Sequence, residues 1–194
     1  MSEARPANEV VVLTAEQMSR TTTRIAHEIL EKNPGVENLA VVGIHTRGAY
    51  LGSRIHALLC EVGGQQYASG NLDISFYRDD VAARGAVGVI PHTPHPVVND
   101  TDLPFVIDGA TVILVDDVLY TGRTIRAAID ALFDYGRPAA VHLAVLVDRG
   151  HHELPIRPDY VGKNLPTALH ERISVRLREC DGVDEVVLVR AKEA

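Results

Sequence analysis

Short apolar stretches alternate along the chain with segments whose apolar residues recur every three to four positions. Residues 39–44 and 111–115 are almost wholly apolar, which is typical of strands buried on both faces of a sheet. Thr14 and Gln17 form a capping box, which predicts that a helix begins there. The pattern predicts strands at 10–13, 39–44, 72–77, 111–115, 141–147, 174–177 and 185–189, and helices from 14 to about 33, at 49–59 and at about 123–135.

Strands that alternate with amphipathic helices predict an α/β fold around a largely parallel sheet. A chain of 194 residues suits one domain, so we expect residues 1–194 to fold as a single unit. Residues 79–104 break the pattern because they are rich in Gly, Pro, His and Asp. We expect an exposed flexible arm there, and plain disorder is the alternative.

Charge and cysteine content narrow the kinds of partner. The net charge is −7, so any RNA binding must come from a local basic patch rather than from the overall field. Cys60 and Cys180 lie far apart, which disfavours a disulfide framework or a zinc site. The first residues lack the apolar core of a secretory signal, and no apolar run approaches a membrane span. We therefore expect a cytoplasmic protein without membrane contact.

The strongest chemical signal follows the apolar run at 111–115. Asp116 and Asp117 come next, and then a turn through Thr121 and Gly122 leads into a helix. In parallel α/β sheets ligands bind beyond the carboxyl ends of strands, where free N–H groups at a helix start attract phosphate. Two carboxylates beside such a phosphate site make sense if they accept hydrogen bonds from ribose hydroxyls. A simple turn capped by the two acids is the alternative.

The segment 112–124 (Val-Ile-Leu-Val-Asp-Asp-Val-Leu-Tyr-Thr-Gly-Arg-Thr) resembles the signature of type I phosphoribosyltransferases that binds 5-phosphoribosyl pyrophosphate (PRPP). Other landmarks resemble the PyrR family, which regulates pyrimidine operons and is also a uracil phosphoribosyltransferase. They lie at residues 23–28, 42–48, 72–80, 136–138, 143–151, 153–157 and 162–164. The resemblance covers nearly the whole chain except the first few residues and about 81–104.

The resemblance implies a type I phosphoribosyltransferase fold with a small hood contributed by about 149–172. It also implies conversion of uracil and PRPP to UMP and pyrophosphate, with Mg²⁺ bound to the pyrophosphate group. Relatives of this kind respond to PRPP, UMP or UTP, bind pyr operon leader mRNA in attenuation, and assemble as homodimers or homotetramers. A salvage enzyme without RNA binding stays open as the alternative, as does a transferase or sensor for another base.

Site residues carry over by motif. Asp116, Asp117 and Arg47 are the candidate catalytic residues. The candidate PRPP and UMP contacts are Thr46, Arg47, Arg78, Asp116, Asp117, Val118, Leu119, Tyr120, Thr121, Gly122, Arg123 and Thr124. From residue chemistry alone, Arg47 could be a surface arginine in an ordinary turn, and Arg78 could belong to a solvated strand end.

Val147, Asp148 and Arg149 are the candidate hood around the base. Purine-specific relatives typically carry Asp immediately before the Thr-Gly of the PRPP loop. This chain has Tyr120 there, which favours uracil over a purine. No general base is evident, so catalysis is expected to come mainly from positioning and electrostatics.

An RNA surface is implied only by the resemblance. Its candidate residues are Thr23, Arg24, His27, Arg149, Arg157 and Lys163. A solvated helix face is the alternative, and it is favoured by helix chemistry alone. His152 and His170 stand where many relatives have fixed positive charge, so RNA binding is expected to be weaker and dependent on salt and pH. His92 and His95 are interpreted as surface residues rather than as a metal pair.

Overall fold

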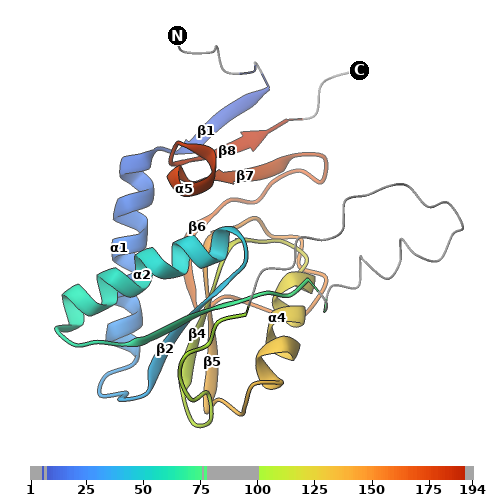
Figure 1. Cartoon of the computed structure of the whole chain (residues 1–194). Coiled ribbons are helices and arrows are strands. Elements are labelled where there is room, and N and C mark those ends of the chain that lie inside the picture. Colours follow the sequence, from blue (N-terminus) through green and yellow to red (C-terminus); the bar gives the residue numbers. More distant parts are fainter. Residues whose placement is uncertain (1–5, 7, 76, 78–100, 191–194) are drawn as a thin grey trace, which may run out of the picture.

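A five-stranded parallel sheet forms the centre of the protein. A computed structural model describes residues 6, 8–75, 77 and 101–190. The strand order is β3-β2-β4-β5-β6, and every neighbouring pair is parallel (Figure 1). The strands are β2 (Leu39–Ile44), β3 (Ala68–Leu72), β4 (Thr111–Leu119), β5 (Ala140–Asp148) and β6 (Tyr160–Asn164). The prediction of an α/β fold with a largely parallel sheet is confirmed.

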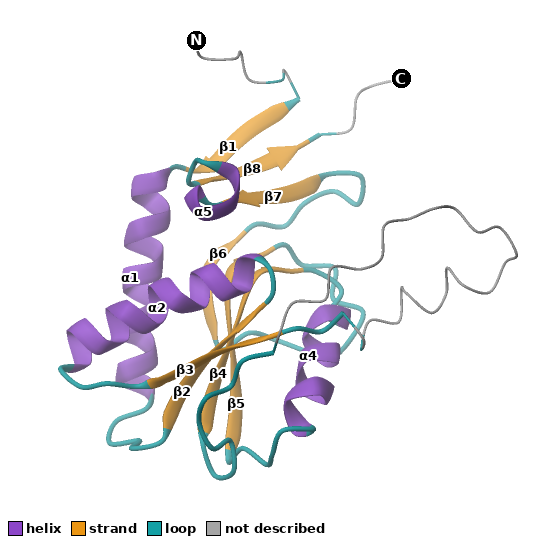
Figure 2. Cartoon of the chain, in the orientation of Figure 1, coloured by secondary structure: helices purple, strands orange, loops and turns teal. Residues whose placement is uncertain are grey.

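Helices cover both faces of this sheet. Helices α1 (Ala15–Lys32) and α2 (Arg47–Gly63) lie on one face, and α4 (Arg123–Phe133) lies on the other (Figure 2). Alternate strand residues pack in opposite directions: Val41 joins the core with α1 and α2, whereas Val42 joins the core with α4. This two-sided burial explains why the central strands are continuously apolar.

The ends of α1 agree with their sequence signals. The Thr14 hydroxyl accepts a hydrogen bond from Gln17 N at 3.4 Å, and the Gln17 side chain accepts one from Thr14 N at 2.9 Å. The predicted capping box is therefore confirmed, and the helix ends at Lys32 with Asn33 as its C-cap.

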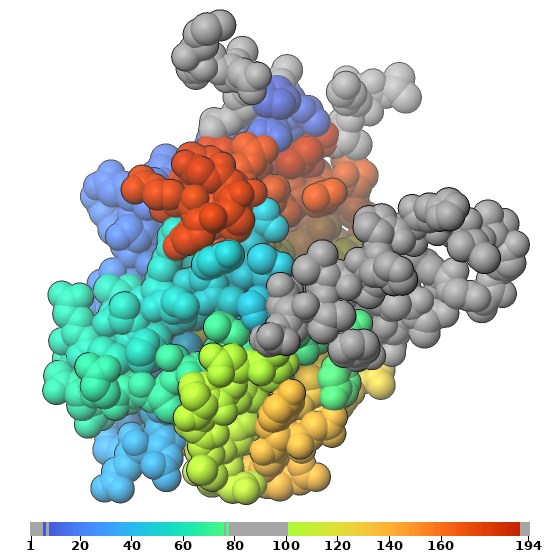
Figure 3. Space-filling view, in the orientation of Figure 1, coloured from blue at the N-terminus to red at the C-terminus, as the bar shows by residue number. Residues whose placement is uncertain are grey.

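A second, smaller sheet joins the two ends of the chain. It has the antiparallel order β1-β8-β7, formed by β1 (Glu9–Leu13), β7 (Arg172–Arg176) and β8 (Glu185–Val189), with the short helix α5 (Arg178–Asp181) between β7 and β8. Arg176 links all three strands because its guanidinium pairs with Glu9 and Glu185 at 2.6 and 2.7 Å. Figure 3 shows these C-terminal residues lying against the start of α2.

Two predicted strands around the site differ most from the observed ones. The strand expected at 72–77 lies earlier, at Ala68–Leu72, and it ends at Leu72 because Asp73 turns the chain by accepting hydrogen bonds from the N–H and hydroxyl of Ser75. The strand expected at 111–115 continues to Leu119, because its pairing with β5 extends to Asp148. The acid pair therefore lies inside β4 rather than in the loop after it.

The two irregular regions have different outcomes. Residues 79–100 of the expected arm lie outside the described residues, whereas Asp102 forms an antiparallel bridge to Asn71 at the edge strand. The hood expected from about 149–172 remains a prediction, although β6 within this range is an edge strand of the main sheet.

Candidate phosphoribosyl site

The predicted site segments meet at one edge of the main sheet. Parallel pairing sets Gly43 of β2 beside Val115 of β4, and Leu119 of β4 beside Asp148 of β5. The residues that follow β2, β4 and β5 therefore emerge at the same edge. Strand register thus brings together three segments that are far apart in sequence.

The two acids sit at the base of this site. Asp116 is buried, and its carboxylate accepts a hydrogen bond from Asp117 N at 2.9 Å. Asp117 is half-buried, and its carboxylate accepts one from Val118 N at 2.9 Å. Burial raises the pKa of Asp117, although the Val118 N–H and the positive charge of Arg47 act in the opposite direction. The pair is held rigidly by backbone donors, as a preorganised acceptor site requires.

The loop after β4 has the geometry of an anion site. Gly122 adopts φ of 92°, a left-handed conformation that favours glycine, and it is the N-cap of α4. Because Gly122 has no side chain, it cannot cap the N–H groups in the first turn of α4, although Arg123 N donates to the neighbouring Thr121 hydroxyl. The Thr121 carbonyl accepts hydrogen bonds from the N–H groups of Glu153 and Leu154 at 3.0 and 3.2 Å. The 153–154 segment thereby fixes the turn.

The hydroxyl groups of Thr121 and Thr124 stay at the loop and the start of α4, whereas the guanidinium of Arg123 pairs with a neighbouring segment. The Thr121 hydroxyl accepts a hydrogen bond from Arg123 N at 3.3 Å, and Thr124 is half-buried in the first turn of α4. Arg123 pairs with Glu153 at 2.8 Å, and both side chains are largely exposed. The structure therefore directs Arg123 toward Glu153, a partner that the sequence did not reveal.

The loop after β2 packs directly on the acid-bearing strand. A Cβ atom at Gly48 would lie 2.5 Å from Val115 O and 3.1 Å from Asp116 Cα. Glycine is therefore required for this approach. The peptide bond between His45 and Thr46 is cis, and Thr46 is the N-cap of α2 without a side-chain cap bond.

Arg47 begins α2 and lies between two acids. Its Nη2 group donates to both carboxylate oxygens of Asp181 at 2.9 and 3.1 Å, and its charge also acts on Asp117. Burial alone would raise the pKa of Asp181, but hydrogen bonds from Leu177 N–H and Arg47 outweigh it and lower that pKa. Arg47 is thus a fixed cation of the site and not an arginine in an unconstrained surface turn.

An aromatic and cationic cluster lies on the β5 side. The Arg149 guanidinium stacks 3.9 Å from the centre of the Tyr120 ring, and the His151 ring meets Tyr120 edge-on at 6.2 Å. Arg149 is only 6% exposed, and it donates to Thr167 Oγ1 at 3.2 Å and to Glu171 O at 3.0 Å. Tyr120, the residue expected to exclude purines, is therefore stacked on a guanidinium that is itself held by hydrogen bonds.

The neighbouring hood candidates are also tied down. Val147 is fully buried in β5. The Asp148 carboxylate accepts a hydrogen bond from Gly150 N and contacts His152 Nε2, both at 2.9 Å. The His152 ring is therefore directed at a local carboxylate.

The RNA candidates do not form one group. Thr23, Arg24 and His27 lie along α1, and Arg24 Nη2 donates to Val161 O and Gly162 O of β6 at 3.0 and 2.7 Å. This contact places the α1 residues beside the strand that carries Lys163. Arg157 is exposed in the segment before β6. Arg149 does not belong to this surface, because it is buried under Tyr120 and its donors are used internally.

Some predictions lie beyond the described residues, and some partners were missed. Arg78, His92 and His95 are among the residues that the structure does not describe. Asp181 and Glu153 were not predicted, although they pair with Arg47 and Arg123. Neither acid belongs to a local pattern with its partner, since 134 and 30 residues separate the pairs.

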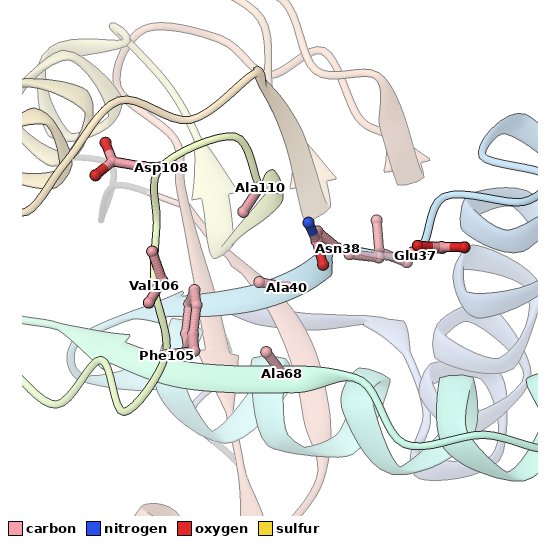
Figure 4. Close-up of a pocket in the computed structure, with 9 residues that line it drawn as sticks. Glu37, Asn38, Ala40, Ala68, Phe105, Val106, Asp108 and Ala110 are labelled. Carbon is pink, nitrogen blue, oxygen red and sulfur yellow. The ribbon is translucent and has the colours of Figure 1, made fainter.

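Within the described ranges, no three His, Cys, Asp or Glu residues cluster as a metal site, and no helix is long and apolar enough to cross a membrane. A separate cavity of about 290 Å³ lies at the opposite, amino-terminal edge of the main sheet, beside Asn38, Ala68, Phe105 and Ala110 (Figure 4). The carboxylates of Glu37 and Asp108 at its rim point away from each other.

The fold and the site define a class of protein. Residues 12–177 match the phosphoribosyl transferase domain family, and the chain belongs to it. Its fold is similar to that of a hypoxanthine phosphoribosyltransferase from Staphylococcus aureus, with a TM-score of 0.68, 19% identity, and coverage of 99% of this chain and 98% of that one. A hypoxanthine phosphoribosyltransferase from Trypanosoma cruzi gives 0.67 at 18% identity, covering 94% and 97%. At such low identity these two comparisons support the fold alone.

Within that class, sequence similarity identifies the subgroup. The chain is 55% identical to the bifunctional protein PyrR of Chloroflexus aurantiacus over 183 residues, covering 94% of this chain and 96% of the relative. It is 56% identical to that of Deinococcus deserti, covering 94% and 95%, and 58% identical to that of Roseiflexus sp., covering 94% and 96%. The chain is therefore a member of the PyrR family.

Proposed function

We propose that this protein transfers the phosphoribosyl group of PRPP to uracil, giving UMP and pyrophosphate, and that its UMP-bound form regulates pyrimidine genes by binding RNA. The observation that carries the catalytic part is the junction of Asp116 and Asp117 with the left-handed Gly122 and the start of α4. The similarity to PyrR proteins over nearly the whole chain supports both parts.

Each part of the junction has a proposed task. The N–H groups around Gly122 and the hydroxyls of Thr121 and Thr124 hold the 5′-phosphate, with Val118, Leu119 and Tyr120 forming the wall of the loop. The carboxylates of Asp116 and Asp117 accept hydrogen bonds from the two ribose hydroxyls. Thr46 and Arg47 contact the leaving pyrophosphate, whose negative charge increases as the bond to C1 breaks.

Mg²⁺ is expected to arrive bound to PRPP. When bound, it neutralises the charge of the leaving pyrophosphate. The chain contributes by holding Arg47 close enough to Asp117 for its charge to act on that carboxylate, which keeps the anion site and the hydroxyl site at one spacing. Because no general base is evident, catalysis depends on orientation of uracil N1 against ribose C1.

Uracil is proposed as the base because Tyr120 occupies the place of a purine-contacting acid. The Tyr120 ring stacks on the Arg149 guanidinium, so the ring cannot change its rotamer without losing that contact. The backbone of Val147, Asp148 and Arg149 then forms the hood that recognises uracil.

The base can be tested by pyrophosphate release at saturating PRPP and Mg²⁺, with uracil and with hypoxanthine as acceptors. Release with uracil and none above background with hypoxanthine is the expected result. Release with hypoxanthine alone would overturn the assignment and favour a purine transferase.

RNA binding is proposed for the surface where α1 meets β6. Thr23, Arg24 and His27 supply polar and basic groups there, and Lys163 and Arg157 extend it along the edge of the sheet. Arg24 also links α1 to β6, because its Nη2 donates to two β6 carbonyl groups. With few free cations, the interaction should be weak and strongly salt-dependent.

A band-shift titration of a pyr leader hairpin, with and without UMP, tests the regulatory part. UMP is expected to strengthen binding of the hairpin over a scrambled RNA of equal length. Equal binding of both RNAs, or no effect of UMP, would leave uracil salvage as the function. The proposal includes a cytoplasmic homodimer or homotetramer, which light scattering at the same protein concentration would identify.

A further inference from the structure

We infer that Asp181 is a positioning residue for phosphoribosyl transfer, because it fixes the guanidinium of Arg47 for the pyrophosphate group of PRPP. This inference rests on the proposed function and extends the site into the C-terminal hairpin (β7, α5 and β8). The juxtaposition that carries it is the double hydrogen bond from Arg47 Nη2 to Asp181, across 134 residues of sequence.

The pair has the geometry of an orienting contact. Both bonds use Nη2, so the pair leaves Nη1 unused, while Nε is buried without a hydrogen-bond partner among the described residues. Asp181 is itself held, because its carboxylate accepts a hydrogen bond from Leu177 N at 2.9 Å. Arg47 therefore keeps one orientation, with a terminal nitrogen available to an anion. A guanidinium that is already oriented loses less side-chain entropy when it binds one.

The position of Arg47 shows which ligand group it would meet. It follows the Thr46 peptide at the carboxyl end of β2, and it is close enough to Asp117 for its charge to oppose the rise in that carboxyl's pKa caused by burial. Asp181 balances the positive charge without filling the site, because its side chain reaches Arg47 from the hairpin. The hairpin thus supplies a residue to a site whose other parts come from the main sheet.

The chain contains a matched control. Arg54, two turns further along α2, pairs with Glu179 of the same hairpin at 2.6 Å and with Asp184 at 2.7 Å. These pairs also fasten the hairpin to α2, and they do so away from Asp117. A Glu179→Gln variant therefore weakens hairpin docking without removing the partner of Arg47.

Asp181→Asn and Glu179→Gln should be compared in steady-state kinetics with thermal unfolding as a folding check. For Asp181→Asn, kcat/KM for PRPP is expected to fall about tenfold and inhibition by pyrophosphate to weaken by a similar factor, with the KM for uracil unchanged. Glu179→Gln should keep all three values within about twofold of the wild type. Equal losses in both variants, or no loss in Asp181→Asn, would overturn the inference.

An Arg47→Ala background provides a second readout that a purely structural role would not produce. There, adding Asp181→Asn should cause no further loss, because the two residues act as one unit. Additive losses would mean that Asp181 acts by another route. If the wild type makes no UMP, the proposed function fails separately. Calorimetric binding of pyrophosphate with Mg²⁺ then decides the inference: weaker binding by Asp181→Asn than by Glu179→Gln supports it, and equal binding refutes it.

Discussion

Replacing Gly48 with alanine should displace the start of α2 from the backbone of the acid-bearing strand. The added Cβ would lie 2.5 Å from Val115 O, whereas ordinary contact begins near 3.4 Å. The two segments must separate by about 0.9 Å, because the opposing atom is backbone and the interior is close-packed. The neighbouring Arg47 and Thr46 would move with the helix.

The size of the effect follows from this displacement. Overpacking by one methyl group costs about 1–3 kcal/mol of unfolding free energy. For a chain of this length that corresponds to a fall in Tm of about 2–4 °C for each kcal/mol. A misplacement of about 1 Å in a catalytic group can lower the rate by about a hundredfold. The kinetic loss in Gly48→Ala should therefore far exceed what its stability loss would suggest.

Gly64→Ala is the matched control, because Gly64 caps the other end of α2. Its φ is 65°, and a Cβ there would meet nothing within 4 Å. The strained backbone should cost about 1–2 kcal/mol and leave kcat/KM for PRPP unchanged. Both variants should be measured by thermal unfolding and by the rate of UMP formation. A folded Gly48→Ala variant with kcat/KM within twofold of the wild type would refute the reasoning.

Three further predictions concern other contacts. Arg149→Ala should raise the KM for uracil and lower the Tm, because Tyr120 loses the guanidinium on which it stacks. Steady-state kinetics with varied uracil measure the KM, and thermal unfolding measures the Tm. Gly122→Ala, at φ of 92°, should cost about 1–2 kcal/mol in urea unfolding and weaken binding of PRPP in calorimetry. Asp184→Asn should lower stability at pH 7 but not at low pH, as unfolding across a pH series would show. Burial opposes ionisation of Asp184, yet hydrogen bonds from Arg54 and the Arg178 N–H lower its pKa. Its stabilisation is therefore present above about pH 4 and lost as pH falls through the lowered pKa.

Each of these has an outcome that contradicts it. A uracil KM unchanged in Arg149→Ala would mean that the Tyr120 stack does not shape the base site. Normal PRPP affinity in Gly122→Ala would remove the left-handed turn from the phosphate site. A stability difference between Asp184→Asn and the wild type that does not shrink as the pH is lowered would show that the pair with Arg54 is not its source.

The parallel sheet and the junction of acids, turn and helix start at 116–124 were predictable because their signals are local. A continuously apolar strand needs cover on both faces, and the acids, turn and helix start follow one another within a few residues. The ends of strands were less predictable. β4 continues through Asp116 and Asp117 because β5 pairs with it that far, and hydrogen bonding to a distant strand leaves no local mark.

The acids that pair with Arg47 and Arg123 were not predictable either, because a partner that is distant in sequence leaves no local mark. Asp181 comes from a short helix in the second sheet, and that sheet forms only when β1 from the start of the chain pairs with β8 near its end. The sequence analysis named Arg149 both for the hood and for RNA contact, but the tertiary fold buries it against Tyr120. Charged residues carry no pattern that tells an exposed role from a buried one.

The formation of UMP from uracil and PRPP, compared between the wild type and Asp117→Asn, tests the central claim most directly. The wild type should form UMP and pyrophosphate in equal amounts. Asp117→Asn, which keeps its shape but loses its charge, should be at least about tenfold slower at subsaturating PRPP, because it weakens a charge-assisted hydrogen bond to ribose. A wild type that forms no UMP, or a variant of undiminished rate, would contradict the assignment of this loop as the site of phosphoribosyl transfer to uracil.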